Sequence, residues 1–227
     1  MRRWRERWLR AGLAVVAFAL AGLGTWVAMP LPGGMLGEPG AGSLRIEDRH
    51  GLLLRATRAD DGNRSGWIPL TAMDPDLPVA FVAVEDRRFY QHHGVDLRAV
   101  ARALRDNLRQ RRIVSGASTI TMQLARLLRP IRRAPIDKLI QAAWALRLEA
   151  HLSKQEILEQ YLNRVPLGQG TAGVAAAMRL YFGSSAAEAS LGQAALLAAL
   201  ARTPSSQNPL VASGAARHRR AIGLTTL

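Results

Sequence analysis

Apolar residues recur with a helical period along most of the chain. The clearest stripe repeats every three or four positions and consists of Leu97, Val100, Leu104 and Leu108. Residues 136–152 predict a second long helix, and residues 154–163 and 191–201 predict two shorter ones. Residues 44–57 alternate loosely around a turn at 50–51, a pattern typical of two short strands. The fold is therefore expected to be mainly α, with a small N-terminal β element.

Capping residues support these helix boundaries. Three serine-led pairs have the spacing of a capping box, namely Ser153 with Glu156, Ser185 with Glu188, and Ser190 with Gln193. Asp96 directly precedes the leucine stripe and is expected to cap its first turn. The chain shows no internal repeat, so these helices are assigned to one domain.

The first thirty residues have the composition of a membrane anchor. Residues 1–10 hold five arginines, and residues 11–29 are 19 positions without a charge. As a helix, this stretch would span about 28 Å, close to the hydrocarbon thickness of a bilayer. The arginines before it predict that the N-terminus faces the cytoplasm and that the rest of the chain lies outside. A cleaved signal peptide is the alternative.

A linker and a domain follow the anchor. Residues 30–42 contain three prolines and five glycines, which is typical of a flexible linker. Apolar residues make up 48% of the chain, enough for a core. The expected organisation is a basic tail at 1–10, an anchor at 11–29, a linker at 30–43 and one domain at 44–227.

Charge and cysteine content narrow the function. With 31 Lys and Arg against 17 Asp and Glu, the net charge is +14, which favours an anionic partner such as nucleic acid, anionic lipid or a phosphorylated substrate. Export across a membrane weakens the nucleic-acid alternative, and 5% aromatic residues offer little surface for base stacking. The chain has no cysteine, which excludes disulfides, thiolate metal sites and a cysteine nucleophile.

Two polar segments could carry chemistry. In the first, Glu85 and Asp86 adjoin the arginines, aromatic residues and histidines at 87–93. This cluster is either a solvated loop that caps a helix or a carboxylate held as general acid or base. In the second, Gly116 precedes several hydroxyls at a predicted helix start, where free N–H groups suit an anion. A plain N-cap would have the same sequence.

Arginines accompany both segments. The four arginines after the hydroxyl cluster alternate with apolar residues and precede Lys138, and such a group can hold a diphosphate near a membrane. They are Arg126, Arg129, Arg132 and Arg133. Four others lie beside the leucine stripe and form either a solvated face or a face on anionic lipid headgroups. These are Arg98, Arg102, Arg105 and Arg109.

Several longer motifs occur in order. The first, E-D-x-x-F-x-x-H-x-G, consists of Glu85, Asp86, Phe89, His92 and Gly94. The second, G-x-S-T-I-T-x-Q, consists of Gly116, Ser118, Thr119, Ile120, Thr121 and Gln123. A later one, K-x-E-I-L-E-x-Y-L-N, runs from Lys154 to Asn163, and a helix with a proline-punctuated loop follows at 196–209. In these motifs the sequence resembles the peptidoglycan glycosyltransferase domain (glycosyltransferase family 51) of class A penicillin-binding proteins, most nearly the 1C type, and of monofunctional transglycosylases.

The third motif of that family, R-K-x-x-E, is altered here. It reads Asp137, Lys138 and Gln141, so the lysine is kept and the glutamate is replaced. Because glutamine cannot hold a charge, a second catalytic carboxylate is not expected at 141. Glu149 lies three helical turns beyond Lys138 and is expected to be structural.

The resemblance implies a lysozyme-like, mainly α fold and an inverting transferase. Such an enzyme polymerises lipid II into β-1,4 glycan strands and releases undecaprenyl diphosphate. Glu85 would be the general base, and cations at Lys138, Arg126 and Arg133 would neutralise the leaving diphosphate. The other residues implied to bind substrate are Asp86, Phe89, His92, Ser118, Thr119, Gln123 and Gln141. No protein-bound cofactor or metal is implied, and Mg²⁺ or Mn²⁺ on the substrate diphosphate is an open alternative.

The implied partners are lipid II, the growing glycan strand, inner-membrane lipids and other cell-wall synthesis proteins, without nucleic acid. The expected location is the bacterial inner membrane, with a single span and the domain on the periplasmic side. Three alternatives stay open: a cell-wall hydrolase, a catalytically silent scaffold and a membrane-tethered nucleic-acid binder. The chain stops about thirty residues after the fifth motif begins, so either a monofunctional enzyme or a truncated two-domain protein is expected.

Overall fold

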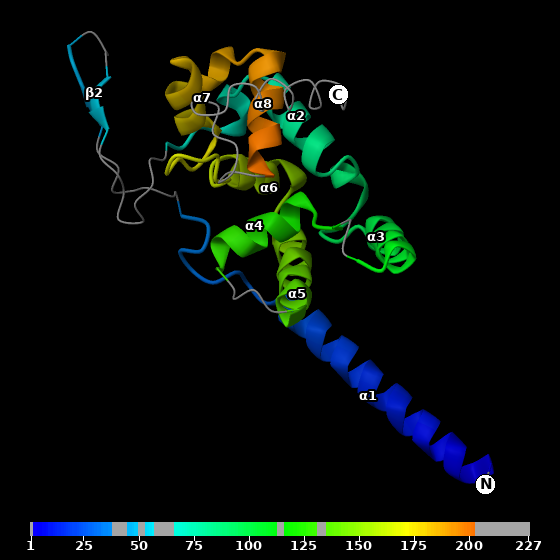
Figure 1. Cartoon of the computed structure of the whole chain (residues 1–227). Coiled ribbons are helices and arrows are strands. Elements are labelled where there is room, and N and C mark those ends of the chain that lie inside the picture. Colours follow the sequence, from blue (N-terminus) through cyan, green and yellow to red (C-terminus); the bar gives the residue numbers. More distant parts are fainter. Residues whose placement is uncertain are drawn as a thin grey trace.

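A computed structural model of the chain describes residues 2–37, 45–49, 53–56, 66–112, 116–130 and 135–202. Within them the chain is mainly helical, as the hydrophobic period predicts (Figure 1). The helices are α1 (Arg2–Ala28), α2 (Asp76–Glu85), α3 (Leu97–Gln110), α4 (Ile120–Leu128), α5 (Pro135–His151), α6 (Lys154–Leu162), α7 (Val174–Phe182) and α8 (Leu191–Ala201). Short 3₁₀ turns are η1 (Leu70–Ala72), η2 (Phe89–Gln91) and η3 (Ala186–Glu188). Arg133 and the loop after position 202 lie outside the described residues.

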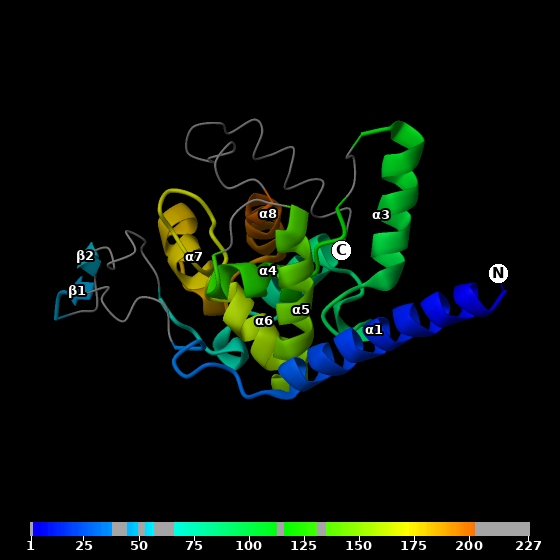
Figure 2. The ribbon, with the colours of Figure 1, turned by 90° about the horizontal axis from the view of Figure 1, so that it is seen from below.

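Helix α1 extends away from the other helices in both views (Figures 1 and 2). Its apolar stretch, Arg10–Ala28, has 19 residues and is not buried against the rest of the protein. The length suffices to cross a bilayer, in agreement with the anchor expected at 11–29. A signal peptide near the N-terminus would meet the same criterion, so cleavage is a separate question.

Arg147 of α5 joins the end of α1 to the helical body. Its Nε donates to the carbonyl of Met29 at 3.2 Å, and its Nη2 donates to that of Pro30 at 2.5 Å. The guanidinium lies 4.6 Å from the ring centroid of Trp26 and 5.0 Å from that of Trp144, and the two rings pack edge to face at 4.9 Å. A cation at helix-terminal carbonyls is favourable, so this junction fixes the direction in which α1 leaves the domain.

The β element is a two-stranded antiparallel sheet. Strand β1 (Arg45–Glu47) pairs with β2 (Leu53–Ala56), with Ile46 opposite Arg55. It lies apart from the helices in Figure 1. In the described part of the expected linker, Leu31 and Met35 pack against the core. Its apolar residues explain the contact.

The core lies where α2 packs on α8 and α4 packs on α5 and α6. Helix α8 is apolar on every face, and all seven residues from 194 to 200 are buried, as expected for a central helix. The largest fully buried side chains include Tyr161, Phe81 and Phe89. These helices hold the carboxyl end of α2 and the first turn of α4 next to each other.

The expected helix caps are mostly confirmed. Ser153 with Glu156 and Ser190 with Gln193 form complete capping boxes, and Asp96 accepts from the amides of Arg98 and Ala99. The third pair is a correction. Ser185 accepts only from the Ala187 amide and opens the single turn η3, and its box is not closed by residue 188.

The leucine stripe of α3 does not face the core. Leu97, Leu104 and Leu108 are 77%, 59% and 69% exposed. Helix α3 stands apart from the bundle on the side toward which α1 extends (Figures 1 and 2). Among the described residues, the stripe is therefore an apolar face without a protein partner.

Candidate active site

A polar cavity of about 820 Å³ opens at the carboxyl end of α2. Its walls come from α2, α3, the loop before α4, α4 itself and the end of α8. The polar lining includes three carboxylates and four arginines, namely Glu85, Asp86, Asp96, Arg87, Arg88, Arg102 and Arg202. Ser118, Thr119 and Gln123 complete it. The cavity thus joins the first two sequence motifs in one space.

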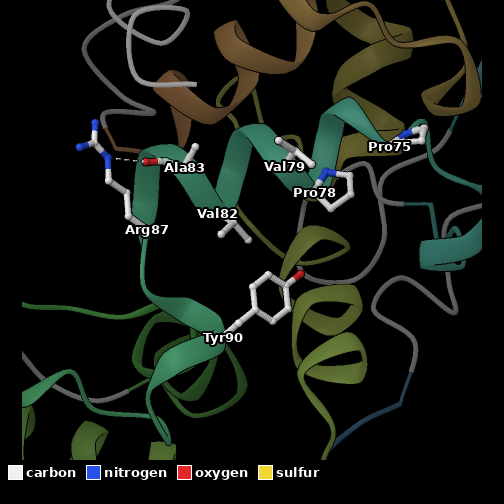
Figure 3. Close-up of a pocket in the computed structure, with 7 residues that line it drawn as sticks. All are labelled: Pro75, Pro78, Val79, Val82, Ala83, Arg87 and Tyr90. Atoms are coloured by element: carbon white, nitrogen blue, oxygen red, sulfur yellow. Dashed lines mark hydrogen bonds between the residues drawn. The ribbon is translucent and has the colours of Figure 1, made fainter.

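A second cavity, of about 510 Å³, lies on another side of α2 and is apolar. It is lined by Pro75, Pro78, Val79, Val82, Ala83, Arg87 and Tyr90. Figure 3 shows Arg87 at one end, turned back to the carbonyl of Ala83, to which its Nε donates at 3.4 Å. No carboxylate lines this cavity, so acid–base chemistry is assigned to the polar one.

Glu85 is the last residue of α2, and its side chain is 7% exposed. Its Oε2 accepts a hydrogen bond from Nε2 of Gln123 at 2.8 Å, and its Oε1 accepts from Nε of Arg202 at 3.0 Å. Tyr161 fixes the amide by donating to Oε1 of Gln123 at 3.1 Å. Burial, together with the charge of Glu85, raises the pKa of Tyr161 well above its ordinary value. The phenol therefore stays protonated and orients Gln123 toward the carboxylate.

Asp86 has a structural role in this conformation. It is 8% exposed, and it pairs with Nε2 of His92 at 3.0 Å and accepts from the Ile120 amide at 3.0 Å. A carboxylate at the free amides of a helix start is favourable, so Asp86 joins the first motif to α4. Phe89 is fully buried and His92 is 7% exposed. Neither lines the cavity, and the substrate contacts expected for these two residues stay a prediction.

Gly94 explains the last position of the first motif. Its φ is +86°, and a Cβ there would lie 2.8 Å from the carbonyl carbon and oxygen of Ala145. Only glycine fits a backbone that is both left-handed and this close to α5. The loop that follows Glu85 is thereby packed directly on α5.

The hydroxyls of Ser118 and Thr119, which precede α4, make different kinds of hydrogen bond. Thr119 is 2% exposed, donates to the carbonyl of Gly94 at 2.6 Å and caps the helix by accepting from the Met122 amide at 3.1 Å. Ser118 instead accepts from Nζ of Lys138 at 2.5 Å. Ser118 is thus the member of the pair whose hydroxyl is directed to a cation, and Thr119 is engaged within the fold.

Lys138 and Arg126 form a cationic group beside Ser118. Both residues are exposed. Partial desolvation, and then the nearby charge of Arg126, lower the pKa of Lys138 below its ordinary value. The contribution of Arg126 shows that the two cations lie close together, an arrangement that suits an anionic ligand.

A buried ion pair supports the site from behind. Oε1 of Glu149 accepts from Nζ of Lys154 and from Oγ1 of Thr121, each at 2.7 Å. Lys154 also donates to the carbonyl of His92 at 2.7 Å and lies over the ring of Phe89. This ion-pair network holds together the first, second and fourth motifs, and the structural role expected for Glu149 agrees with it.

The end of the fourth motif holds the chain that leads into α2. Glu159 accepts from the Leu70 amide at 2.7 Å. The Asn163 side chain both accepts from the amide of Ile68 and donates to its carbonyl, each at 2.9 Å. These two motif residues are therefore structural ties and lie away from the cavity lining.

Gln141 lies one helical turn from Lys138 on α5 and is 8% exposed. Its side chain makes no hydrogen bond to the described part of the chain. Arg133 falls in the segment that is not described.

Among the described residues, no group of three or more His, Asp or Glu could hold a metal ion. The Mg²⁺ or Mn²⁺ alternative concerns an ion carried by the substrate and stays open.

Sequence reasoning missed Arg202. It lies 117 positions from Glu85 and contacts both that carboxylate and the carbonyl of Val84. Nothing in its local sequence marks it, because only the packing of α8 on α2 brings it to the cavity. Tyr161 stands in the fourth motif, and its contact with Gln123 follows only from the packing of α6 on α4.

Comparison with known proteins places these features in a family. Residues 51–227 match the family described as Transglycosylase. The chain is 42% identical over 160 residues to penicillin-binding protein 2D of Bacillus subtilis, covering 70% of this chain and 23% of that protein. It is 39% identical over 207 residues to penicillin-binding protein 1C of Escherichia coli, covering 90% of this chain and 26% of that protein.

The crystal structure of penicillin-binding protein 1A from Haemophilus influenzae aligns with 81% of this chain and 18% of its own, at 24% identity and a TM-score of 0.43. The chain spans about a quarter or less of the length of these three penicillin-binding proteins.

Proposed function

Because the chain belongs to the transglycosylase family, we propose that it is a peptidoglycan glycosyltransferase. Its substrate would be lipid II, a disaccharide-pentapeptide on a lipid diphosphate, which it polymerises into β-1,4 glycan strands. The observation that carries the proposal is the composition of the polar cavity. A carboxylate, Glu85, faces it from one wall, and the cations around Ser118 stand at its edge.

Glu85 is proposed as the general base. The 4-hydroxyl of the acceptor sugar attacks the anomeric carbon of the growing chain, and its proton passes to Glu85. The new C–O bond forms as the bond from that carbon to the diphosphate breaks, and the electron pair leaves with undecaprenyl diphosphate. A single displacement on an α-linked donor gives the β product. A positioned base contributes about 10²–10⁴ in rate, and Gln123 keeps Glu85 directed into the cavity.

The leaving diphosphate is proposed to bind Ser118, Lys138 and Arg126. The hydroxyl and the ammonium are already in contact, and positioned cations stabilise the charge that develops on a leaving phosphate. Arg133 is assigned to the same role by the resemblance alone. A hydrolase needs a general acid for an alcohol leaving group, whereas a diphosphate leaves as an anion, so this cationic edge favours transfer.

The protein is proposed to be a single-pass protein of the bacterial inner membrane. The arginines before α1 support a cytoplasmic N-terminus and a domain on the outer side. The exposed leucines of α3 and the arginines beside them suit an anionic lipid surface. Such a placement would keep the cavity near the lipid carrier of its substrate.

One experiment distinguishes the candidate functions. The purified full chain is incubated with labelled lipid II in one reaction and with preformed glycan strands in another. Polymer on a gel is expected from lipid II, with the glycan strands left intact. Cleavage of the strands would indicate a hydrolase, and no reaction with either would indicate the silent scaffold.

A further inference from the structure

Glu85 has two hydrogen-bonding partners of different kinds. Gln123 is neutral, and its amide is locked by the fully buried Tyr161. Arg202 is charged, is the C-cap residue of α8, and has a side chain that is 55% exposed. One carboxylate oxygen is therefore held by a fixed group and the other by a group that can leave into water.

Arg202 makes a second contact that explains its position. Its Nη2 donates to the carbonyl of Val84, the residue before Glu85. This carbonyl belongs to the last turn of α2, where the helix lacks internal donors and its dipole favours a cation. Arg202 thus fixes the backbone and the side chain at the carboxyl end of α2.

The same contact obstructs the base. Oε1 of Glu85 is covered by the guanidinium, and a general base must accept a hydrogen bond from the hydroxyl that it deprotonates. Release is possible on the side of Arg202, because its own side chain is 55% exposed and its guanidinium can be hydrated once it leaves. Arg202 also lines the cavity with Arg87, Arg88 and Arg102, so an anionic substrate would enter a region that attracts it.

We propose that Arg202 is a positioning latch on Glu85. In this structure it holds the carboxylate toward the cavity. When the substrate binds, the guanidinium transfers to a phosphate oxygen of the substrate and frees Oε1. No bond is made or broken in this step except hydrogen bonds. The inference rests on the proposed function for its substrate, whereas the Arg202–Glu85 pairing can be tested without substrate.

The first test needs no turnover. A water-soluble carbodiimide with an amine nucleophile is applied to the full chain without substrate, and modification at Glu85 is followed by peptide mass spectrometry. Glu85 is expected to react several-fold faster in Arg202→Ala than in the wild type, because the guanidinium no longer shields it. Arg98→Ala, which removes an exposed arginine outside the cavity lining, should react like the wild type. Equal rates in all three proteins would overturn the latch.

The second test separates binding from chemistry. On lipid II, Arg202→Ala is expected to raise KM about tenfold, the scale of one charge-assisted hydrogen bond, while kcat changes by less than about threefold. Arg202→Lys keeps the charge and should restore most of the KM. A fall in kcat with unchanged KM, or no rescue by lysine, would contradict transfer to the substrate. If the wild type itself fails to polymerise lipid II, the proposed function is wrong, and the labelling test still decides the pairing.

Discussion

The ion-pair network behind the site offers the sharpest test of how the motifs are held together. Glu149 and Lys154 have side chains only 6% and 18% exposed and are 2.7 Å apart. Lys154→Met keeps an unbranched apolar side chain but removes the ammonium, which lies over the ring of Phe89. Glu149 would then be a buried carboxylate whose one remaining partner in the network is Thr121.

The expected loss follows from that burial. Removing one member of a buried ion pair costs about 3–5 kcal/mol, because the other charge is left uncompensated. For a protein of this size, the melting temperature should fall by about 6–20 °C. The double variant Lys154→Met/Glu149→Gln removes the unpaired charge and leaves an amide that can still bond Thr121. It should therefore be more stable than Lys154→Met alone.

The measurement is thermal and denaturant unfolding of the full chain in detergent, followed by circular dichroism. Glu149→Gln alone serves as the matched single variant and should cost less than Lys154→Met, because Lys154 is more exposed than Glu149 and keeps the carbonyl of His92 as an acceptor. A loss below about 1 kcal/mol for Lys154→Met, or a double variant less stable than that single one, would refute the idea that the charge of Glu149 needs Lys154.

Three further outcomes are expected. Lys138→Ala should lower kcat/KM on lipid II more than Gln141→Ala, because it removes a full charge from the diphosphate site. Loss of the glutamine should cost about 1–2 kcal/mol of transition-state stabilisation at most. The opposite order of initial rates would contradict the placement of the diphosphate site at Lys138. Arg126→Gln should raise the pKa of Lys138, because one cause of its lowering is removed. The alkaline limb of the pH–rate profile should therefore shift to higher pH. An unchanged limb would show that Arg126 does not influence the titration of Lys138. Arg147→Met should lower the free energy of unfolding by about 1–3 kcal/mol, because two carbonyls at the end of α1 lose their donor. An unchanged denaturant titration would show that these hydrogen bonds do not contribute to stability.

Local features were predictable from the sequence because their causes are local. The caps at Ser153 and Ser190 each need only a side chain and an amide three residues apart. The helical period and the apolar anchor likewise depend on neighbours in the chain. The family resemblance, which the match over residues 51–227 confirms, depends on motifs that are short and continuous.

Other features depend on which helices pack together. An apolar stripe such as that of α3 has the same period whether it meets a core, a lipid surface or another protein, so its exposure could not be read from the sequence. Thr119 and His92 carry polar groups of the kind that bind ligands. In the fold, however, Thr119 donates to the carbonyl of Gly94 and His92 pairs with Asp86. Arg202 reaches Glu85 only because α8 packs on α2.

The role of Glu85 as the base of glycosyl transfer is the central claim, and Glu85→Gln tests it most directly. The amide keeps the shape of the side chain and can still accept from Gln123, so the thermal melt should stay nearly unchanged. Glu188→Gln, the same change at an exposed carboxylate outside the cavity lining, is the matched control and should polymerise labelled lipid II like the wild type. The account predicts that Glu85→Gln lowers the polymerisation rate by about 10²–10⁴. A folded Glu85→Gln that keeps more than about a tenth of the wild-type rate would contradict it.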